Sequence, residues 1–235
     1  MAFNLLDHSR TIVNLIQCLA TALSRDKLLR LTQFFARFYA WFLSRRKCRT
    51  RNIATWKLVM KQAALIRRLS RLGNNIQYFQ VAIQTFLAKD QDPVLLYAAI
   101  GRQLGLAGFL TCDAAIALDT LDMWRLKSTE RVHIEASRLW SIAVLCNIIA
   151  GGYELCKLQQ QQRTGEKVDA VSRHRHMTIE RKFSQLQLFS DLCDLIIATS
   201  PLLIVRMSDG VIGICGIIST IASMCISQKN RSQLN

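Results

Sequence analysis

The sequence predicts an all-α protein, namely a membrane-associated helical bundle with amphipathic helices and a C-terminal apolar hairpin or transmembrane segment. Apolar residues make up 51% of the 235 positions, and only 20% are charged. The chain has 10 Gly and 2 Pro, so it offers few turn signals and favours long helices. No alternation of strand and helix patterns runs along it, which argues against a nucleotide-binding sheet.

Positive charge is concentrated in the N-terminal third. The formal net charge is +15, and residues 1–80 hold 15 Lys and Arg against two acids, Asp7 and Asp26. Such a segment attracts a polyanion, which is either a nucleic acid or an anionic bilayer.

Residues 3–43 are predicted to form one or two helices, the second of them rich in aromatic side chains. Arg30 and Arg37 argue against a spanning helix there, because each buried charge would cost roughly 2.5–3.5 kcal/mol. A basic cluster follows, consisting of Arg45, Arg46, Lys47, Arg49 and Arg51. This cluster fits a solvated loop, a nucleic-acid patch or a contact for anionic lipid, and the sequence leaves these alternatives open.

The segment that organises the chain runs from residue 52 to about 87. At about 100° per residue, its cationic and aliphatic side chains fall on different sides of one helix. The predicted basic, lipid-binding face consists of Lys57, Lys61, Arg67, Arg68 and Arg71. The predicted apolar, lipid-binding face consists of Leu58, Leu65, Ile66, Leu69, Leu72 and Ile76. Amphipathic helices commonly pack on a protein core, and that alternative stays open here. No acidic residue lies in the segment, which strengthens the interpretation of an interfacial membrane helix.

The break at residues 89–93 ends in Pro93, and a helix is predicted from there to residue 124. It is long enough to span a bilayer, although Arg102 and Asp113 lie within it. Gly101 and Gly105 are expected to permit close helix packing or contacts between copies. The next predicted helix covers residues 128–158, and its apolar part is shorter than the roughly 20 residues that span a bilayer unaided.

A polar, low-complexity linker is predicted at residues 159–178. From residue 179 a last amphipathic helix leads into two apolar runs, 195–205 and 210–226, which we expect to form a hairpin that enters or crosses the bilayer. A buried hairpin in a soluble bundle is the alternative. Gly213 and Gly216 are expected to pack against other helices or other copies.

Four regions follow from this pattern. Residues 1–88 are predicted to be a basic, amphipathic, membrane-remodelling region, and residues 89–158 a central region that is partly embedded in the membrane. The polar linker at 159–178 precedes a C-terminal apolar hairpin or membrane anchor at 179–235.

Sequence signatures of enzymes are missing. The chain contains no G-x-S-x-G, P-loop, H-E-x-x-H or kinase motif, and its acids are not paired near a histidine. We therefore expect no enzyme, no cofactor and no metal site.

With these residues considered together, the chain resembles the peroxin-11 family of peroxisomal membrane elongation and proliferation proteins, in its fungal form. The resemblance covers nearly the whole length, and it rests on the order and spacing of residues 25–41, 67–84, 117–125, 191–205 and 209–224. It implies a peroxisomal membrane protein that inserts an amphipathic helix, forms homo-oligomers on an anionic phospholipid membrane, tubulates that membrane and works with the peroxisome fission machinery.

Two other functions remain open at this stage. Arg102 and Asp113 within apolar helices suggest a pore-forming or metabolite-transport protein of the peroxisomal membrane. The net charge suggests a helical nucleic-acid-binding protein, but the C-terminal apolar run speaks against it, and we expect no nucleic-acid partner. The number of membrane spans also stays open.

Overall fold

The computed structural model describes residues 22–47, 49–87, 92–163, 170–202 and 207–232, and nearly all of these residues are helical. No strand occurs among them. The prediction of an all-α protein is therefore confirmed. The described elements are α2 Ala22–Arg45, α3 Thr50–Ser70, α4 Asn74–Leu87, α5 Pro93–Thr120, α6 Thr129–Arg163, α7 Ala170–Thr199, the 3-10 helix η1 Ser200–Leu202 and α8 Asp209–Ser232.

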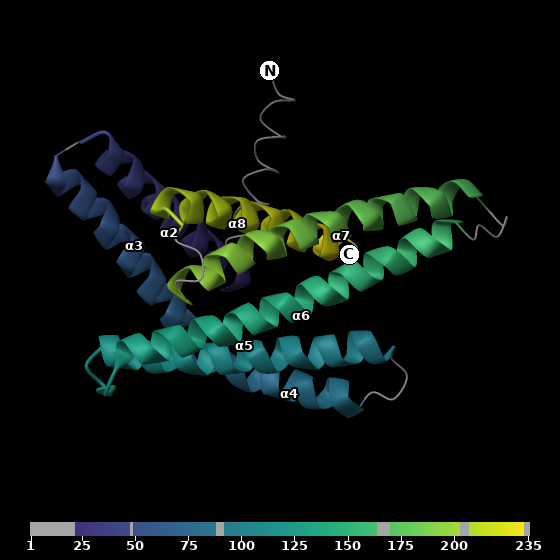
Figure 1. Ribbon diagram of the computed structural model, residues 1–235, viewed down its shortest axis with the longest axis horizontal. Coiled ribbons are helices and arrows are strands. Elements are labelled where there is room, and N and C mark those ends of the chain that lie inside the picture. Colours follow the sequence, from purple (N-terminus) through teal and green to yellow (C-terminus); the bar gives the residue numbers. More distant parts are fainter. Residues whose placement is uncertain (1–21, 48, 88–91, 164–169, 203–206, 233–235) are drawn as a thin grey trace, which may run out of the picture.

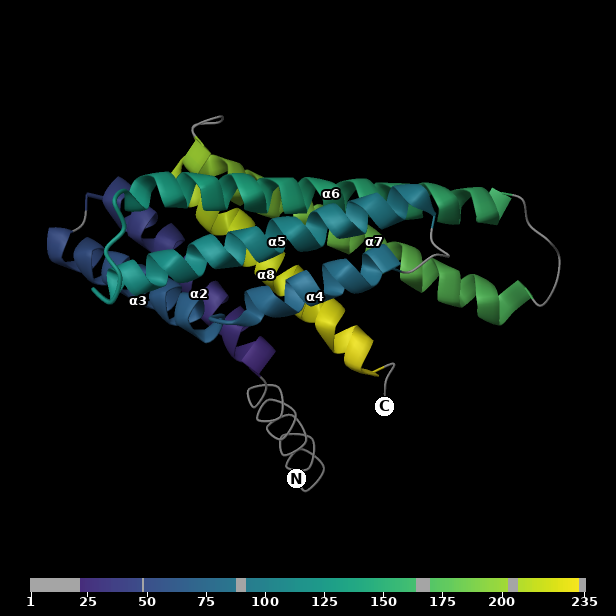
Figure 2. The ribbon, with the colours of Figure 1, turned by 90° about the horizontal axis from the view of Figure 1, so that it is seen from below.

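The helices pack in an order that differs from their order in the chain. Neighbours in space run α3, α2, α8, α7, α6, α5 and α4, and α3 also meets α5. Figure 1 shows α4, α5 and α6 below, α2, α7 and α8 above, and α3 crossing between the two groups. Because α3 and α5 close this series into a ring, helices from both groups surround a common interior, which Figure 2 shows from below.

The segment at residues 52–87 is two helices, so the prediction of one continuous amphipathic helix was wrong. α3 ends at Ser70, and α4 begins at Asn74. Gly73, in the turn between them, has φ +85°, a conformation that glycine adopts without the strain other residues would meet. The turn redirects the chain, so residues after Gly73 do not continue the faces of α3.

The segment at residues 159–178 is helical at both ends. α6 extends to Arg163, and α7 already begins at Ala170, where a polar linker was expected. Gln, Arg and Lys are good helix formers, so a polar composition does not by itself end a helix.

Small residues let the helices approach closely. A Cβ atom added to Gly105 in α5 would lie 2.9 Å from Ala143 Cβ in α6, and one added to Gly213 in α8 would lie 2.7 Å from Phe38 Cβ in α2. Such close contacts between helices are typical of membrane proteins, where packing replaces the hydrophobic effect.

On α8, large apolar side chains lie on the outer surface, while small polar groups lie inside. Ile214, Ile218 and Ile221 are exposed, whereas Ser219 and Thr220 are fully buried. Three helices are long and apolar enough to cross a membrane: Pro93–Thr120, Thr129–Lys157 and Asp209–Lys229. At most 39% of each apolar window is buried inside the chain, so the remainder requires lipid or another protein. The predicted membrane-associated bundle is thus confirmed. α6 is long and apolar enough to span a bilayer, although its apolar part had been judged too short from the sequence.

A buried carboxyl group on α7 makes stability depend on pH. Burial raises the pKa of Asp191 to about 6, although Gln187 and Asn147 donate hydrogen bonds of 2.9 and 2.5 Å to it. Since this folded-state pKa exceeds the ordinary aspartate pKa of 3.8, protonation favours the folded state, and stability rises as pH falls through 6. We expect the thermal unfolding midpoint to gain several degrees between about pH 7.5 and about pH 5, and Asp191→Asn to reduce that gain. An equal gain in both proteins would show that another group is responsible.

Candidate membrane-contacting surface and cationic cavity

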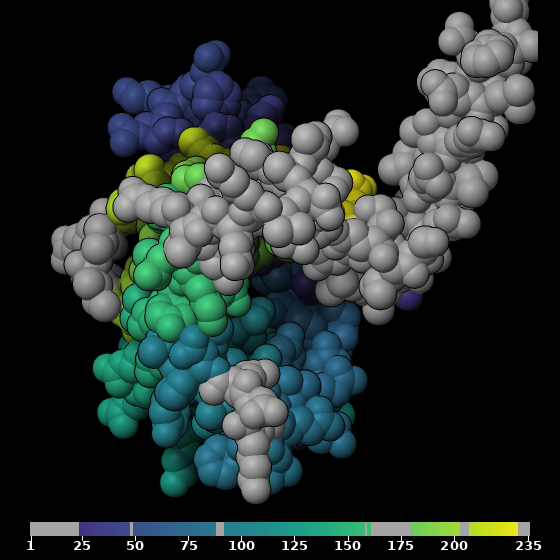
Figure 3. All heavy atoms as spheres, turned by 90° about the vertical axis from the view of Figure 1, so that its right-hand side faces the viewer, coloured from purple at the N-terminus to yellow at the C-terminus, as the bar shows by residue number. Residues whose placement is uncertain are grey.

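α4 carries an apolar face that the described part of the chain leaves uncovered. Its exposed side chains recur at helical spacing and comprise Ile76, Phe79, Ile83, Phe86 and Leu87. The opposite side packs on α5, where Ala82 is buried and Asn75 Nδ2 donates a 3.2 Å hydrogen bond to Thr111 Oγ1. In the space-filling view of Figure 3, α4 and α5 form the lower part of the molecule and the start of α3 lies at the top.

The length of α4 limits how it can meet a bilayer. The helix has 14 residues and no charged side chain. At 1.5 Å per residue it is about 21 Å long, which is short of the roughly 30 Å hydrocarbon core. It can therefore enter one leaflet, but it cannot cross both.

The predicted apolar residues are mostly accessible. Leu58, Ile66, Leu72 and Ile76 are exposed, and Leu65 and Leu69 are half-buried. Ile76 belongs to α4, whereas Leu58, Leu65, Ile66 and Leu69 belong to α3 and Leu72 to the turn. Lipid binding by these six residues stays a prediction.

The predicted basic residues divide into two groups. Lys57 and Lys61 are exposed on α3, as is the basic cluster at the turn between α2 and α3. Arg67, Arg68 and Arg71 instead face an internal cavity of about 870 Å³. Headgroup binding by these five residues also stays a prediction, and in this arrangement only the two lysines have free access to a membrane surface.

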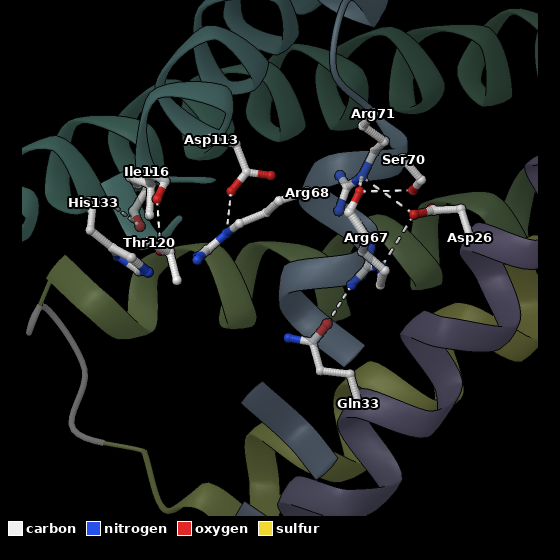
Figure 4. Close-up of polar contacts among 11 residues, drawn as sticks. Asp26, Gln33, Arg67, Arg68, Ser70, Arg71, Asp113, Ile116, Thr120 and His133 are labelled. Carbon is white, nitrogen blue, oxygen red and sulfur yellow. Dashed lines mark hydrogen bonds and ion pairs between the residues drawn. The ribbon is translucent and has the colours of Figure 1, made fainter. Parts of the chain in front are cut away.

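Acids from distant segments pair with the inward-facing arginines (Figure 4). Arg67 Nε and Arg71 Nε lie 3.2 and 3.3 Å from the same Asp26 oxygen in α2. Arg68 Nε lies 2.7 Å from Asp113 Oδ1 in α5. The absence of acids within residues 52–87 therefore does not mean that these charges are uncompensated. The signal available in the sequence was Asp26 itself, a rare acid in a basic region.

Arg67 is the most constrained of the three. Its side chain also donates a 2.6 Å hydrogen bond from Nη1 to Gln33 Oε1, and the residue is only 9% exposed. Burial, followed by repulsion from Arg71, lowers the pKa of Arg67 to about 9, and Asp26 opposes this effect. The guanidinium remains charged at neutral pH, with one carboxylate shared between two cations.

The arginines that argued against a spanning α2 are also paired. Arg30 contacts Asp194 in α7 and donates a 3.1 Å hydrogen bond to Ser219 Oγ in α8. Arg37 donates bonds of 3.0 and 2.8 Å to Asp209 Oδ1 at the start of α8. These contacts fix α2 against the C-terminal hairpin.

The four glycines predicted for packing or oligomer contacts lie between helices of the same chain. Gly101 meets Cys146 and Gly105 meets Ala143, both on α6, while Gly213 and Gly216 meet α2. A role in contacts between copies stays a prediction.

Arg102 and Asp113, which suggested a pore, are not brought together. Asp113 lines the large cavity, whereas the exposed Arg102 lines a separate cavity of about 390 Å³ with Asn147 and Asp191.

Comparison with known proteins gives a consistent set of relatives. A family model described as peroxisomal biogenesis factor 11 (PEX11) matches residues 12–226. The chain is 22% identical to peroxisomal membrane protein PMP30A of Candida boidinii, over 94% of this chain and 95% of that protein. It is 21% identical to peroxisomal biogenesis factor 11 of Schizosaccharomyces pombe, over 90% and 92% of the two chains. It is 25% identical to the peroxisomal membrane protein 11 homolog of Dictyostelium discoideum, over 92% and 93%. No solved structure matches the chain.

Proposed function

Because the chain belongs to the PEX11 family of peroxisomal biogenesis factors, we propose that it inserts an amphipathic element into one leaflet of the peroxisomal membrane, tubulates that membrane and so promotes peroxisome fission and proliferation. The protein is a peroxisomal membrane protein of a family that acts in peroxisome biogenesis, and the resemblance inferred from the sequence is confirmed. This family is not a known enzyme family.

The observation that carries the proposal is the uncovered apolar face of α4. Burying one large aliphatic or aromatic side chain contributes about 1.5–3 kcal/mol. Several such side chains on one 14-residue helix give a strong drive into the acyl region. Because the helix is too short to cross, it adds area to one leaflet only, and the bilayer bends to accommodate it.

Exposed cations on α3 add attraction to an anionic membrane. Lys57 and Lys61 lie on the outside, and each basic residue near an anionic surface contributes about 1 kcal/mol of attraction. In this proposal the lysines and the basic cluster hold the headgroups, while the apolar side chains of α3 and α4 enter the leaflet.

Homo-oligomerisation would concentrate the inserted helices of several copies along one membrane tubule. The fission machinery would then act on that tubule. Since the four glycines already contact other helices of the same chain, copies would meet through exposed faces such as that of α8. The second copy of the chain and the fission machinery are therefore both part of the proposal.

Charge placed on the apolar face should abolish tubulation. We expect full-length protein with Ile76→Glu and Ile83→Glu to lose the ability to tubulate liposomes that contain anionic phospholipid, because each carboxylate would have to enter the acyl region. Electron microscopy of the reconstituted liposomes measures the fraction that carries tubules.

The matched control places the same two charges on the same helix. Gln77→Glu and Gln84→Glu alter exposed polar positions of α4 and should leave most tubules in place. If both double variants tubulated liposomes equally well, the membrane-inserting element would not be the apolar face of α4. Release of a trapped solute without tubules would favour the pore alternative instead.

A further inference from the structure

The large cavity has two chemically different sides. Arginines of α2 and α3 line one side. The helices α5, α6 and α7 contribute an apolar patch of Leu106, Phe109, Ile116, Trp140 and Ile197, beside the polar Asp113, His133 and Asp194. Phe109 and Trp140 stack with their ring centroids 5.5 Å apart and give this patch a flat aromatic surface. A cavity with arginines on one side and an apolar patch on the other suits a molecule that has both an anionic and an apolar part.

Positive charge exceeds negative charge in the cavity. The described lining residues include six arginines but only three aspartates, Asp26, Asp113 and Asp194. Arg37 is paired with Asp209 outside the lining. If Asp26 is assigned to Arg67, Asp113 to Arg68 and Asp194 to Arg30, two lining arginines have no carboxylate of their own. They are Arg25 and Arg71, and Arg71 shares Asp26 with Arg67. Arg71 is largely shielded from water, where charge without a carboxylate of its own is costly, and a bound anion removes that cost. Arg25 is exposed and adds attraction for the same anion at the mouth of the cavity.

We infer that this cavity binds an anionic amphiphile, with its carboxylate or phosphate head on Arg25, Arg67 and Arg71 and its hydrocarbon chain along Phe109 and Trp140. Guanidinium groups suit such heads because they donate paired hydrogen bonds to two oxygens. This inference concerns the inside of the bundle, so it is independent of the outward face of α4.

Size and access agree with a ligand of this kind. The volume of about 870 Å³ lies within the range of roughly 300–1,000 Å³ that small-molecule pockets occupy. Arg25 and Ile66, both among the lining residues, are exposed, so the cavity reaches the surface beside α2 and α3.

Quenching of Trp140 by a brominated chain tests the inference. Full-length protein is reconstituted in phosphatidylcholine vesicles and titrated with a brominated fatty acid, while tryptophan fluorescence is recorded. We expect saturable quenching that disappears in Trp140→Phe, because this tryptophan lies beside the proposed chain. The double variant Arg25→Gln, Arg71→Gln should need at least about tenfold more ligand for half-maximal quenching, since it loses two charge-assisted contacts to the head.

The double variant is chosen to leave the structure intact. It removes the two excess charges but keeps the pairs Arg67–Asp26 and Arg68–Asp113. Lys127→Gln with Arg131→Gln removes the same charge from the exposed start of α6, away from the cavity lining, and it should leave the quenching curve unchanged.

A second arm distinguishes the source of the ligand. Brominated phosphatidic acid, included as a minor component of the vesicles, should quench Trp140 if the head is that of a bilayer lipid, whereas the added fatty acid quenches if the amphiphile is free. Quenching of Trp140 in either arm that depends on Arg25 and Arg71 supports the inference. Brominated phosphatidylcholine should give no saturable quenching in either case.

Three results would overturn the inference. The first is absence of Trp140 quenching in both arms, and the second is quenching that is indifferent to Arg25 and Arg71. The third is stabilisation by inorganic phosphate through these arginines without any Trp140 quenching, since the cavity would then hold only a small oxyanion. Tubulation should survive in the arginine double variant, and quenching should survive Ile76→Glu with Ile83→Glu, so the two proposals fail separately.

Discussion

Gly216→Leu is expected to lower the free energy of unfolding by about 3 kcal/mol or more, because it forces the ring of Phe34 out of the bundle. A Cβ atom at this position would lie 2.1 Å from Phe34 Cγ, a distance that two carbon atoms cannot adopt without displacement. Phe34 is 5% exposed and forms the buried apolar cluster with Ile197 and Ile212. Displacing it therefore disturbs three helices at once, α2, α7 and α8. Thermal unfolding in detergent micelles, followed by circular dichroism, measures the effect.

The same substitution has a matched control on α6. A Cβ atom added to Gly152 would meet nothing within 4 Å. Gly152→Leu should therefore keep the unfolding midpoint or raise it slightly, since leucine favours helix over glycine by about 0.5–1 kcal/mol. If both variants behaved alike, the close contact between α2 and α8 would not hold the fold together.

Asp113→Ala is expected to cost about 3 kcal/mol, because it leaves Arg68 in the cavity without its counter-ion. The Asp113 and Arg68 side chains are 10% and 23% exposed, and Arg68 makes no second ion pair among the described residues. Removing one partner of a buried pair is far more costly than replacing both. The double variant Arg68→Met, Asp113→Leu should therefore recover most of the loss. Denaturant or thermal unfolding of Arg68→Met, of Asp113→Leu and of the double variant gives the coupling energy.

An exposed pair supplies the comparison for this cycle. Glu135 and Arg138 on α6 are 2.6 Å apart, but more than half of each side chain is exposed. Solvent screens such a pair, so Glu135→Ala should change stability by less than about 1 kcal/mol. If Asp113→Ala and Glu135→Ala had equal effects, Asp113 would be solvated rather than enclosed.

Features that depend on local chemistry were accessible from the sequence. Pro93 marks the start of α5 because a residue without an N–H group fits the first helical turn. The uncharged run at residues 210–226 lies within α8, since a long apolar segment with few helix breakers forms a helix. The resemblance to the family also came from the sequence, through the order of several separated segments.

Features that depend on contacts between distant segments were not accessible. A helical wheel assigns a face to each residue, but it does not say which face is inside. Arg67, Arg68 and Arg71 were read as outward because no acid lay nearby in sequence, yet their partners come from α2 and α5. Conversely, Ile76 and Ile83 could have faced a core, and their exposure became evident only from the packing of α4 on α5. The turn at Gly73 was a local signal that the uninterrupted apolar pattern concealed.

The pairing of α2 with α8 has a consequence for how the protein is made. Arg30 in α2 and its hydrogen-bond partner Ser219 in α8 are separated by 189 positions in the sequence. During translation, α2 is therefore synthesised long before the helix that covers it, and its cations have no permanent counter-ions in that interval. Closing so long a loop carries an entropic cost and slows folding. The bundle can therefore be completed only after the last helix has been made, so the N-terminal helices stay without their final packing partners until synthesis ends.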